Sequence, residues 1–406
     1  MPFKKEVLSL PYSKIIAGLA LVYAFVLPLS RAGISFFTLL LIFVWLLEGN
    51  FKHKMQKILD NKVMQVLFVF LLFNMISSIW TDNILGTVDY VKKYWYFSPI
   101  VIFYTSLKKE YIHQILSAFI LGMFVSEIIA YGVFFELWQY KHATPDNPSP
   151  FMHHIEYSVF LAFSALILLG RIFHEAKLYM KLSYAFFFLS ISGNLFLTAG
   201  RTGQIAFVLG LFVLAMVSFK NKVKALSVFV LLSAVILTVA FQLSDTFKER
   251  VLTAQHSMRS VVNEQNYCSS WGSRVGVCMI AKEMIENHPL IGEGIMDNMR
   301  RLHTLIDKKY PEMKCVQANL MHMHNQYIQI VTEIGLIGLV LFLGIFYQIG
   351  RLDIQNKAFL HMKYIYLTVL LFSFVSEVIF HRQFSMAFFA LIVGLLLVEN
   401  RVNDEV

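Results

Sequence analysis

Apolar runs long enough to cross a membrane recur along almost the whole chain. A helix needs about 20 apolar residues to cross a hydrocarbon core about 30 Å thick, and most of these runs approach that length. We predict twelve helical spans, over residues 15–30, 32–47, 63–80, 94–107, 112–138, 154–170, 182–198, 202–219, 225–243, 326–349, 359–380 and 384–398. The run at 94–107 is short and contains Pro99, so a re-entrant segment is the alternative there.

The composition agrees with this pattern, because 57% of the residues are apolar and only 15% are charged. Such a composition is typical of an integral membrane protein rather than of a water-soluble domain. The sequence therefore predicts an all-α membrane protein with about twelve transmembrane helices.

The longest polar interruption covers residues 244–323, about 80 residues between the ninth and tenth predicted spans. It lacks the Gly/Ser-rich or Pro-rich composition of a flexible linker, and its apolar residues recur at helical spacing. We expect a folded helical loop between two transmembrane regions, residues 1–243 and 324–406. Three apolar stripes in it are expected to pack against each other or against the outer leaflet: Phe247, Val251, Ala254 and Met258; Val277, Ile280, Ala281 and Met284; and Ile295, Met299, Leu302 and Ile306.

Lysine and arginine orient the predicted bundle, because short cytoplasmic loops retain positive charge. With the N-terminus inside, the predicted inner segments hold about three basic residues for each one in the short outer connections. Both termini are then cytoplasmic, and residues 244–323 lie outside. The net charge of +9 is explained by this bias and by contacts with anionic membrane lipids, so no nucleic-acid partner is expected.

All three cysteines, Cys268, Cys278 and Cys315, fall in the long outer segment. An oxidising compartment would permit one disulfide among them, and the sequence does not choose among the three possible pairs. Three unpaired thiols are the alternative.

Two arginines are candidates for binding an anionic substrate group. Arg201 lies in a connection so short that the seventh and eighth spans must form a hairpin with Arg201 at its tip. Arg274 lies near the start of a predicted loop helix, where the helix dipole disfavours a cation and an anionic partner would help it. An arginine that contacts lipid headgroups and a solvated surface charge are the respective alternatives.

His324 is the candidate for acid-base chemistry. It precedes Asn325 and the tenth span, so its ring is expected at the membrane boundary, where a neutral imidazole accepts a proton near pH 7. A structural role is the alternative, and His322 competes for the same function. The His-x-His pair also raises metal binding, but no nearby Asp or Glu completes a site, so neither a metal nor a cofactor is expected.

Other polar residues at the outer ends of spans are weaker candidates. Arg31 and Arg382 lie in short outer connections and either extend an anionic site or anchor the interface. His153 and His154 are weaker candidates for lining an acceptor side, and a structural role is the favoured alternative. Glu377 is costly in lipid, so it is expected to face the interior and to pair with Arg, His or backbone groups, with local neutralisation of Arg382 as one option and no catalytic role assigned.

Three segments resemble the O-antigen ligase and polymerase superfamily in their order and spacing. They are Thr-Ala-Gly-Arg-Thr-Gly at 198–203, the run from Ser-Arg-Val-Gly to Asn-His-Pro-Leu-Ile-Gly-Glu-Gly at 273–294, and His-Asn-Gln-Tyr followed by Glu-Ile-Gly-Leu-Ile-Gly at 324–338. The resemblance covers roughly residues 182–349, and the N-terminal spans are matched by hydropathy alone. Within the superfamily the chain is most like the ligases.

The resemblance implies a GT-C-like membrane glycosyltransferase that works without a metal, inverts the anomeric centre, and acts at the periplasmic face of the bacterial inner membrane. It implies an undecaprenyl-pyrophosphate-linked glycan as donor and a lipid A-core sugar hydroxyl as acceptor. Arg201 and Arg274 match the family arginines thought to hold the pyrophosphate. His324 matches the family histidine proposed as the base.

The acceptor is less defined than the donor. A ligase, a polymerase and a protein O-oligosaccharyltransferase use the same kind of donor and differ in the acceptor. One substantial outer loop, and a chain that ends at Val406 soon after the last span, favour the ligase. A transporter is disfavoured because the two halves show no repeat and the candidate arginines lie at one surface. A monomer is expected.

Overall fold

The computed structural model describes residues 11–401, apart from the side chain of His174, and within this range the chain is helical with no β-strand. Its helices are α2 (Tyr12–Val26), α3 (Arg31–Glu48), α4 (Phe51–Asp60), α5 (Lys62–Ile76), η1 (Ser77–Ile79), α6 (Ile84–Lys92), η2 (Lys93–Phe97), α7 (Ser98–Ser106), η3 (Lys109–Tyr111), α8 (Ile112–Phe134), α9 (His154–His174), α10 (Leu178–Leu197), α11 (Arg201–Ser218), α12 (Lys222–Leu243), α13 (Asp245–Glu264), α14 (Ser270–Asn287), α15 (Asp297–Lys309), η4 (Pro311–Met313), α16 (Lys314–Gln317), α17 (Gln326–Gly350), α18 (Lys357–Ser376) and α19 (Gln383–Asn400). The prediction of an all-α membrane protein is confirmed.

Ten helices of the described residues are long and apolar enough to cross a membrane, and each matches a predicted span. The first predicted span corresponds to α2, an apolar helix of 15 residues. The fourth corresponds to α7, which has only nine residues and follows the short 3-10 helix η2. Pro99 lies in the first turn of α7, where a missing N–H costs no hydrogen bond. The count of twelve crossings therefore stays a prediction.

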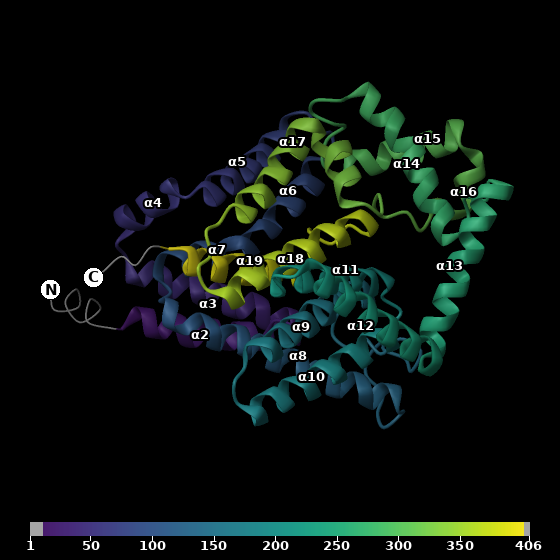
Figure 1. Cartoon of the computed structure of the whole chain (residues 1–406). Coiled ribbons are helices and arrows are strands. Elements are labelled where there is room, and N and C mark those ends of the chain that lie inside the picture. Colours follow the sequence, from purple (N-terminus) through teal and green to yellow (C-terminus); the bar gives the residue numbers. More distant parts are fainter. Residues whose placement is uncertain (1–10, 402–406) are drawn as a thin grey trace.

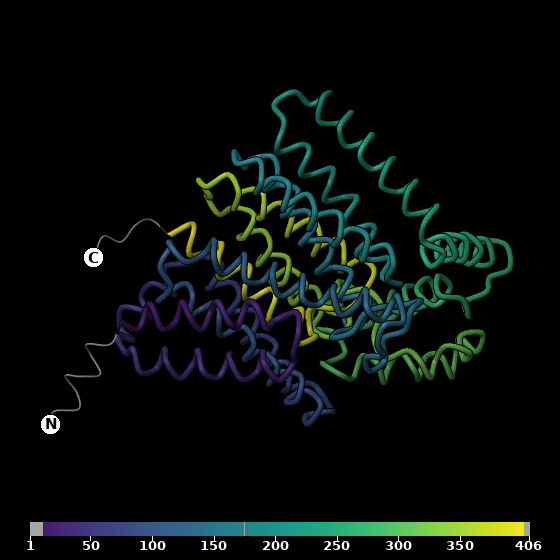
Figure 2. The backbone as a smooth tube through the Cα atoms, turned by 90° about the horizontal axis from the view of Figure 1, so that it is seen from below, coloured from purple at the N-terminus to yellow at the C-terminus, as the bar shows by residue number. Residues whose placement is uncertain are grey.

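Two helices form the centre of the bundle. The span of α19 is 89% buried and that of α9 is 83% buried, whereas α12 is 11% buried. α19 packs against α7, α3 and α18, and α9 packs against α10, α11 and α18. The apolar α12 lies along the outer edge of the bundle in Figure 2, which is the expected place for a helix that faces lipid on most sides.

Helices α13 to α16 lie together at one end of the bundle (Figure 1). The start of α2 and the end of α19 lie at the opposite end in the same view. This arrangement agrees with the predicted topology, in which both termini face one side of the membrane and residues 244–323 face the other.

The helices of residues 244–323 have a small apolar core of their own. Two of the three predicted stripes supply most of it: Val277, Ile280 and Met284 from α14 meet Leu302 and Ile306 from α15. The stripe on α13 contributes less to this core: Phe247 is buried, whereas Val251 and Met258 are 41% and 49% exposed. The other expected partner of that stripe, the outer leaflet, stays a prediction.

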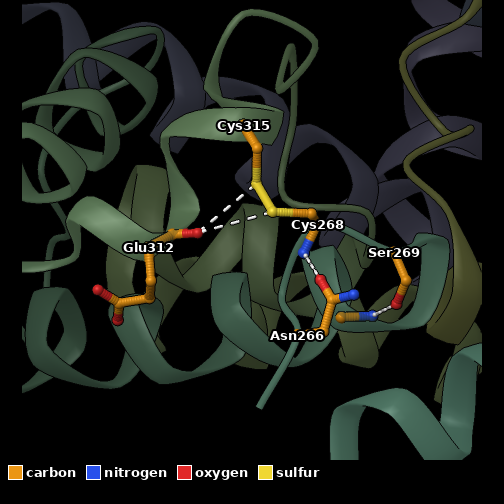
Figure 3. The surroundings of a disulfide bond; sticks show 6 residues. Asn266, Cys268, Ser269, Glu312 and Cys315 are labelled. Atoms are coloured by element: carbon orange, nitrogen blue, oxygen red, sulfur yellow. Dashed lines mark hydrogen bonds between the residues drawn. A yellow bond between two sulfur atoms is a disulfide. The ribbon is translucent and has the colours of Figure 1, made fainter. Parts of the chain in front are cut away.

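A disulfide joins Cys268 to Cys315, and Cys278 remains a free, exposed thiol. Figure 3 shows the bridge beside the backbone carbonyl of Glu312, with the backbone N–H of Cys268 donating to Asn266 Oδ1 at 2.9 Å. The bridge connects the start of α14 to α16 across 47 residues of sequence, which restricts the unfolded chain of this segment. It also resolves the choice among the three possible pairs.

The long helix α17 is broken at Ile334 and Gly335. The segment 289–294 fills the break with its own backbone: Glu293 N donates to Thr332 O, and Gly294 N donates to Glu333 O, both at 2.9 Å. In return, Leu336 N donates to Pro289 O at 2.9 Å. Backbone groups freed at membrane depth need such partners, because the hydrocarbon offers none. The break therefore fastens the loop helices to the bundle.

Candidate active site

Asn325 fixes the position of His324 at the entrance to α17. The Asn325 side chain caps the helix by accepting from the N–H groups of Tyr327 and Ile328 at 2.9 and 3.0 Å. Its amide nitrogen also donates to Val375 O at 3.0 Å, at the end of α18. His324 itself has a φ of 52°, in the left-handed region that costs a non-glycine residue about 1 kcal/mol or more. Strain held in this way is typical of functional positions.

Glu377 brings the two histidines together. It ends α18, is 2% exposed, and accepts from the backbone N–H of Val378 at 3.1 Å. Its Oε1 lies 3.2 Å from His322 Nε2 and 3.7 Å from His324 Nδ1. Glu377 was expected to pair with Arg, His or backbone groups, and its partners are the two histidines and the backbone of Val378, while Arg382 approaches Glu156 instead. The extended backbone at Glu377 turns its carboxylate toward the histidines that precede α17.

The two shortest contacts of its ring nitrogens favour one tautomer of His322. The backbone N–H of His324 donates to His322 Nδ1 at 3.3 Å, so a neutral ring carries its proton on Nε2, which faces Glu377. If His324 likewise carries its proton on Nδ1, toward Glu377, its Nε2 is left as a proton acceptor. This is the tautomer that a general base requires.

The charges of this group agree with that assignment. Burial lowers the pKa of His322 to about 4, and the nearby charges of Arg382 and Arg274 act in the same direction. Burial alone would raise the pKa of Glu377, but its close contact with His324 and its attraction to both imidazoles outweigh this and lower the pKa to about 2. At neutral pH, Glu377 is therefore an anion and His322 is neutral.

Arg382 lies beside His322, and it shares the carboxylate of Glu156 with Arg31. Arg382 Nη2 is 3.5 Å from His322 Nε2, and Arg382 Nη1 is 3.8 Å from the buried carboxylate of Glu156. The positive charge of Arg31 also acts on Glu156, and its guanidinium lies over the ring of Phe384. Since Glu156 balances some of this charge, Arg382 and Arg31 are less available to a substrate than arginines without a carboxylate.

The glycines around Arg201 explain the motif at 198–203. A Cβ on Gly200 would lie 2.3 Å from Ser158 Cβ, and one on Gly203 would lie 2.2 Å from the backbone of Ser158. Both glycines therefore allow α11 to approach α9 closely, and Ser158 Oγ accepts from Gly203 N at 3.1 Å. The motif thus places Arg201, the first residue of α11, against the end of α9 that begins at His154.

Three arginines from different helices converge at this point. The charges of Arg250, on α13, and Arg274, on α14, both act on Arg201. Arg274 donates to the carbonyl of Ser270 at 2.6 Å, which orients its guanidinium. None of the three forms a salt bridge with a carboxylate among residues 11–401. Like charges that converge without a counter-ion form a site for an anion.

The arginine group and the histidine group belong to one site. The charge of Arg274 acts on His322, and that of Arg250 acts on His154. His154 stacks on His153 with ring centres 4.1 Å apart. The structure therefore gathers the sequence candidates at one end of the bundle: Arg31, His153, His154, Arg201, Arg274, His322, His324 and Arg382.

Sequence analysis missed two residues of this site. Arg250 lies in a helix that carries no motif, and only the fold brings α13 to α11. Glu377 was expected near the outer end of its span, but its partners lie in a distant segment of sequence.

The residues also permit the metal site that the His-x-His pair suggested and that was not expected to be complete. One ligand atom each from His322, His324 and Glu377 lies within 4.8 Å of the others. Glu377 is the acidic ligand that was expected to be missing. Two imidazoles and a carboxylate are a donor set that Zn²⁺ accepts, so a metal-independent reaction stays a proposal to be tested.

Residues 185–343 match the protein-family model described as O-antigen ligase. No curated protein matches the chain. The matched range contains the arginine group and both histidines, whereas Glu377 and Arg382 follow it.

Proposed function

Given that the chain belongs to the O-antigen ligase and polymerase superfamily, whose members are glycosyltransferase-like enzymes of O-antigen assembly, we propose that it is an O-antigen ligase. It transfers a glycan from undecaprenyl pyrophosphate to a sugar hydroxyl of the lipid A-core at the periplasmic face of the inner membrane. The observation that carries the proposal is the group of Arg201, Arg250 and Arg274 beside His324 and Glu377.

The arginine group suits the pyrophosphate of the donor. Guanidinium groups bind phosphate oxygens with paired, charge-assisted hydrogen bonds and stay charged at every relevant pH. Negative charge grows on the pyrophosphate as its bond to the sugar breaks, so cations already in place stabilise the transition state. The three arginines therefore supply the charge stabilisation that a divalent cation provides in other transferases.

His324 and Glu377 suit the acceptor half of the reaction. Nε2 of His324 accepts the proton of the acceptor hydroxyl while the hydroxyl oxygen attacks the anomeric carbon. The bond from that carbon to the pyrophosphate breaks, and its electron pair leaves with undecaprenyl pyrophosphate. Attack from the face opposite the leaving group inverts the anomeric centre. Glu377 is a positioning residue, which holds Nδ1–H of His324 and stabilises the imidazolium that forms.

The proposal is tested in a strain that lacks the protein. Lipopolysaccharide is separated by electrophoresis, and polymer on the undecaprenyl carrier is measured in parallel. A ligase predicts loss of the long-chain ladder with full-length polymer stranded on the carrier. A core with a single repeat would instead indicate a polymerase, and an unchanged ladder would contradict both and direct the search to glycoproteins.

A further inference from the structure

A cavity with several polar side chains lies at the other end of the bundle from the histidines. It has a volume of about 270 Å³ and is bounded by helices α8, α9, α10 and α18. Arg171 marks its position, because it lies on α9 about 25 Å from His154 at the helical rise of about 1.5 Å per residue. The cavity is thus separate from the proposed active site, and the inference does not depend on the proposed function.

Polar side chains from four helices meet in this cavity. They belong to His113 and Ser117 on α8, Arg171 on α9, Tyr184 on α10 and His361 on α18. Arg171 Nη2 donates to Ser117 Oγ at 3.1 Å, and its guanidinium lies over the ring of Tyr184 with 5.7 Å to the centroid. Both contacts fix the guanidinium in place without neutralising it.

The cavity is lined by one cation, Arg171, and one anion, Glu175. Arg171 forms no salt bridge with any carboxylate among the described residues. Glu175 also lines the cavity, but its Oε1 is occupied by the backbone N–H groups of Ala176 and Lys177, both at 3.0 Å. An anion that entered the cavity would therefore meet the fixed guanidinium of Arg171, which has no carboxylate in salt-bridge contact.

The cavity changes character along the helices. Arg171 lies near the end of α9, and His113 lies near the start of α8, so these polar side chains lie at the level of the membrane interface. Deeper in the bundle, by about a helical turn, the cavity is lined by the apolar side chains of Ile167, Leu116 and Ile365. A ligand that fits this order has an anionic head and an apolar chain.

We propose that this cavity binds a phosphate group, carried by an anionic phospholipid of the cytoplasmic leaflet. Arg171 pairs with the phosphate, Ser117 and Tyr184 flank it, and an acyl chain extends along Ile167 and Leu116 toward the membrane centre. Basic pockets between transmembrane helices on the cytoplasmic side are general sites for anionic lipid headgroups. The space beside Gly170 keeps the cavity open, since a Cβ there would meet only Leu214 Cδ1, at 3.7 Å.

Native mass spectrometry of the purified full-length protein with added phosphatidylglycerol tests the site. We expect Arg171→Gln to weaken lipid binding by about tenfold, the loss of one charged phosphate contact. Arg351→Gln is the matched control, because Arg351 is an exposed arginine at the same end of the bundle, beside Tyr347. Gly170→Leu fills the cavity without removing charge and should weaken binding as well.

Two further measurements complete the test, and the first uses only the wild-type protein, so it does not depend on the folding of a variant. Phosphatidylglycerol should bind more tightly than phosphatidylcholine. If the cavity also accepts soluble phosphate, inorganic phosphate alone should raise the melting temperature of the wild type more than that of Arg171→Gln. That result would support the site and would add free phosphate to its ligands. Equal lipid binding by Arg171→Gln and Arg351→Gln, or no preference for phosphatidylglycerol in the wild type, would overturn the proposal.

Discussion

The buried carboxylate of Glu377 gives the two histidines different environments. His322 has Nδ1 occupied by a backbone N–H and Nε2 turned toward Glu377, so it has no nitrogen free for a substrate proton. His324 Nδ1 lies 3.7 Å from Glu377 Oε1, whereas its Nε2 forms no salt bridge or hydrogen bond among the described residues. The contacts thus separate a supporting histidine from a candidate base, which the sequence pattern His-x-His did not do.

We predict that Glu377→Gln lowers kcat of transfer by about 10²-fold with a small effect on KM, because it weakens the positioning of a base without touching the substrate. The pKa values of Glu377 and His322 are lowered to about 2 and about 4, so neither group changes charge above about pH 6. Loss of the anion removes a stabilising partner of protonated His324. The acidic limb of the rate profile should therefore move to lower pH.

Glu377→Asp should recover some of the rate, and Glu399→Gln is the matched control. Glu399 is also a buried glutamate, but it pairs with Lys109 away from the site. An unchanged pH profile in Glu377→Gln, or an equal loss of rate in Glu399→Gln, would assign Glu377 a structural role only.

We predict that Arg201→Lys also impairs transfer, by about 10²-fold or more, although it keeps the charge. An ammonium cannot form the paired hydrogen bonds of a guanidinium with a phosphate oxygen pair. Initial rates with a polyprenyl-pyrophosphate donor measure the effect. Arg259→Lys, on the exposed side of α13, is the control, and a wild-type rate in Arg201→Lys would favour a lipid-headgroup role for Arg201.

At the scale of elements, the break in α17 depends on glycines in two separate segments. Gly335 has a φ of 68°, and a Cβ there would lie 2.1 Å from the backbone of Leu290. Gly292 has a φ of 71°, and a Cβ there would lie 2.6 Å from the backbone of Glu333. These contacts explain why the motif segments 273–294 and 324–338 contain their glycines, which do not take part in the chemistry.

We predict that Gly335→Ala destabilises the protein by about 2 kcal/mol or more, because the methyl group meets fixed backbone and the left-handed conformation is strained. Thermal unfolding in detergent measures the loss. Gly350→Ala on the same helix is the control, since its Cβ would meet only Leu367 Cδ1, at 3.9 Å. Equal melting temperatures for the two variants would contradict the role given to the break.

The sequence predicted elements best where one physical requirement dominates. Transmembrane helices must satisfy their backbone and bury apolar residues over a fixed length, so ten predicted spans match long apolar helices. The stripe on α13 leaves Val251 and Met258 exposed rather than packed against the other loop helices, so its expected contact with the outer leaflet stays a prediction. The break in α17 was not predicted, because the backbone that fills it lies in another segment.

At the scale of the whole molecule, one end of the bundle holds the proposed transfer site and the other holds the proposed lipid cavity. Both use arginines without a carboxylate partner among the described residues, as expected of a protein that handles phosphate-bearing lipids. The motifs in the sequence identified His324, Arg201 and Arg274. Glu377 and Arg250 needed the fold, because separate helices bring them to the site.

The most direct test of the central claim is transfer by the purified protein in lipid nanodiscs. Wild type is supplied with undecaprenyl-pyrophosphate-linked glycan and lipid A-core, with and without a chelator, beside His324→Ala and the exposed control His256→Ala. We predict glycosidic bond formation that the chelator does not affect, a loss of about 10²- to 10⁴-fold in His324→Ala, and a normal rate in His256→Ala. A wild-type rate in His324→Ala, or no transfer by the wild type, would contradict the account.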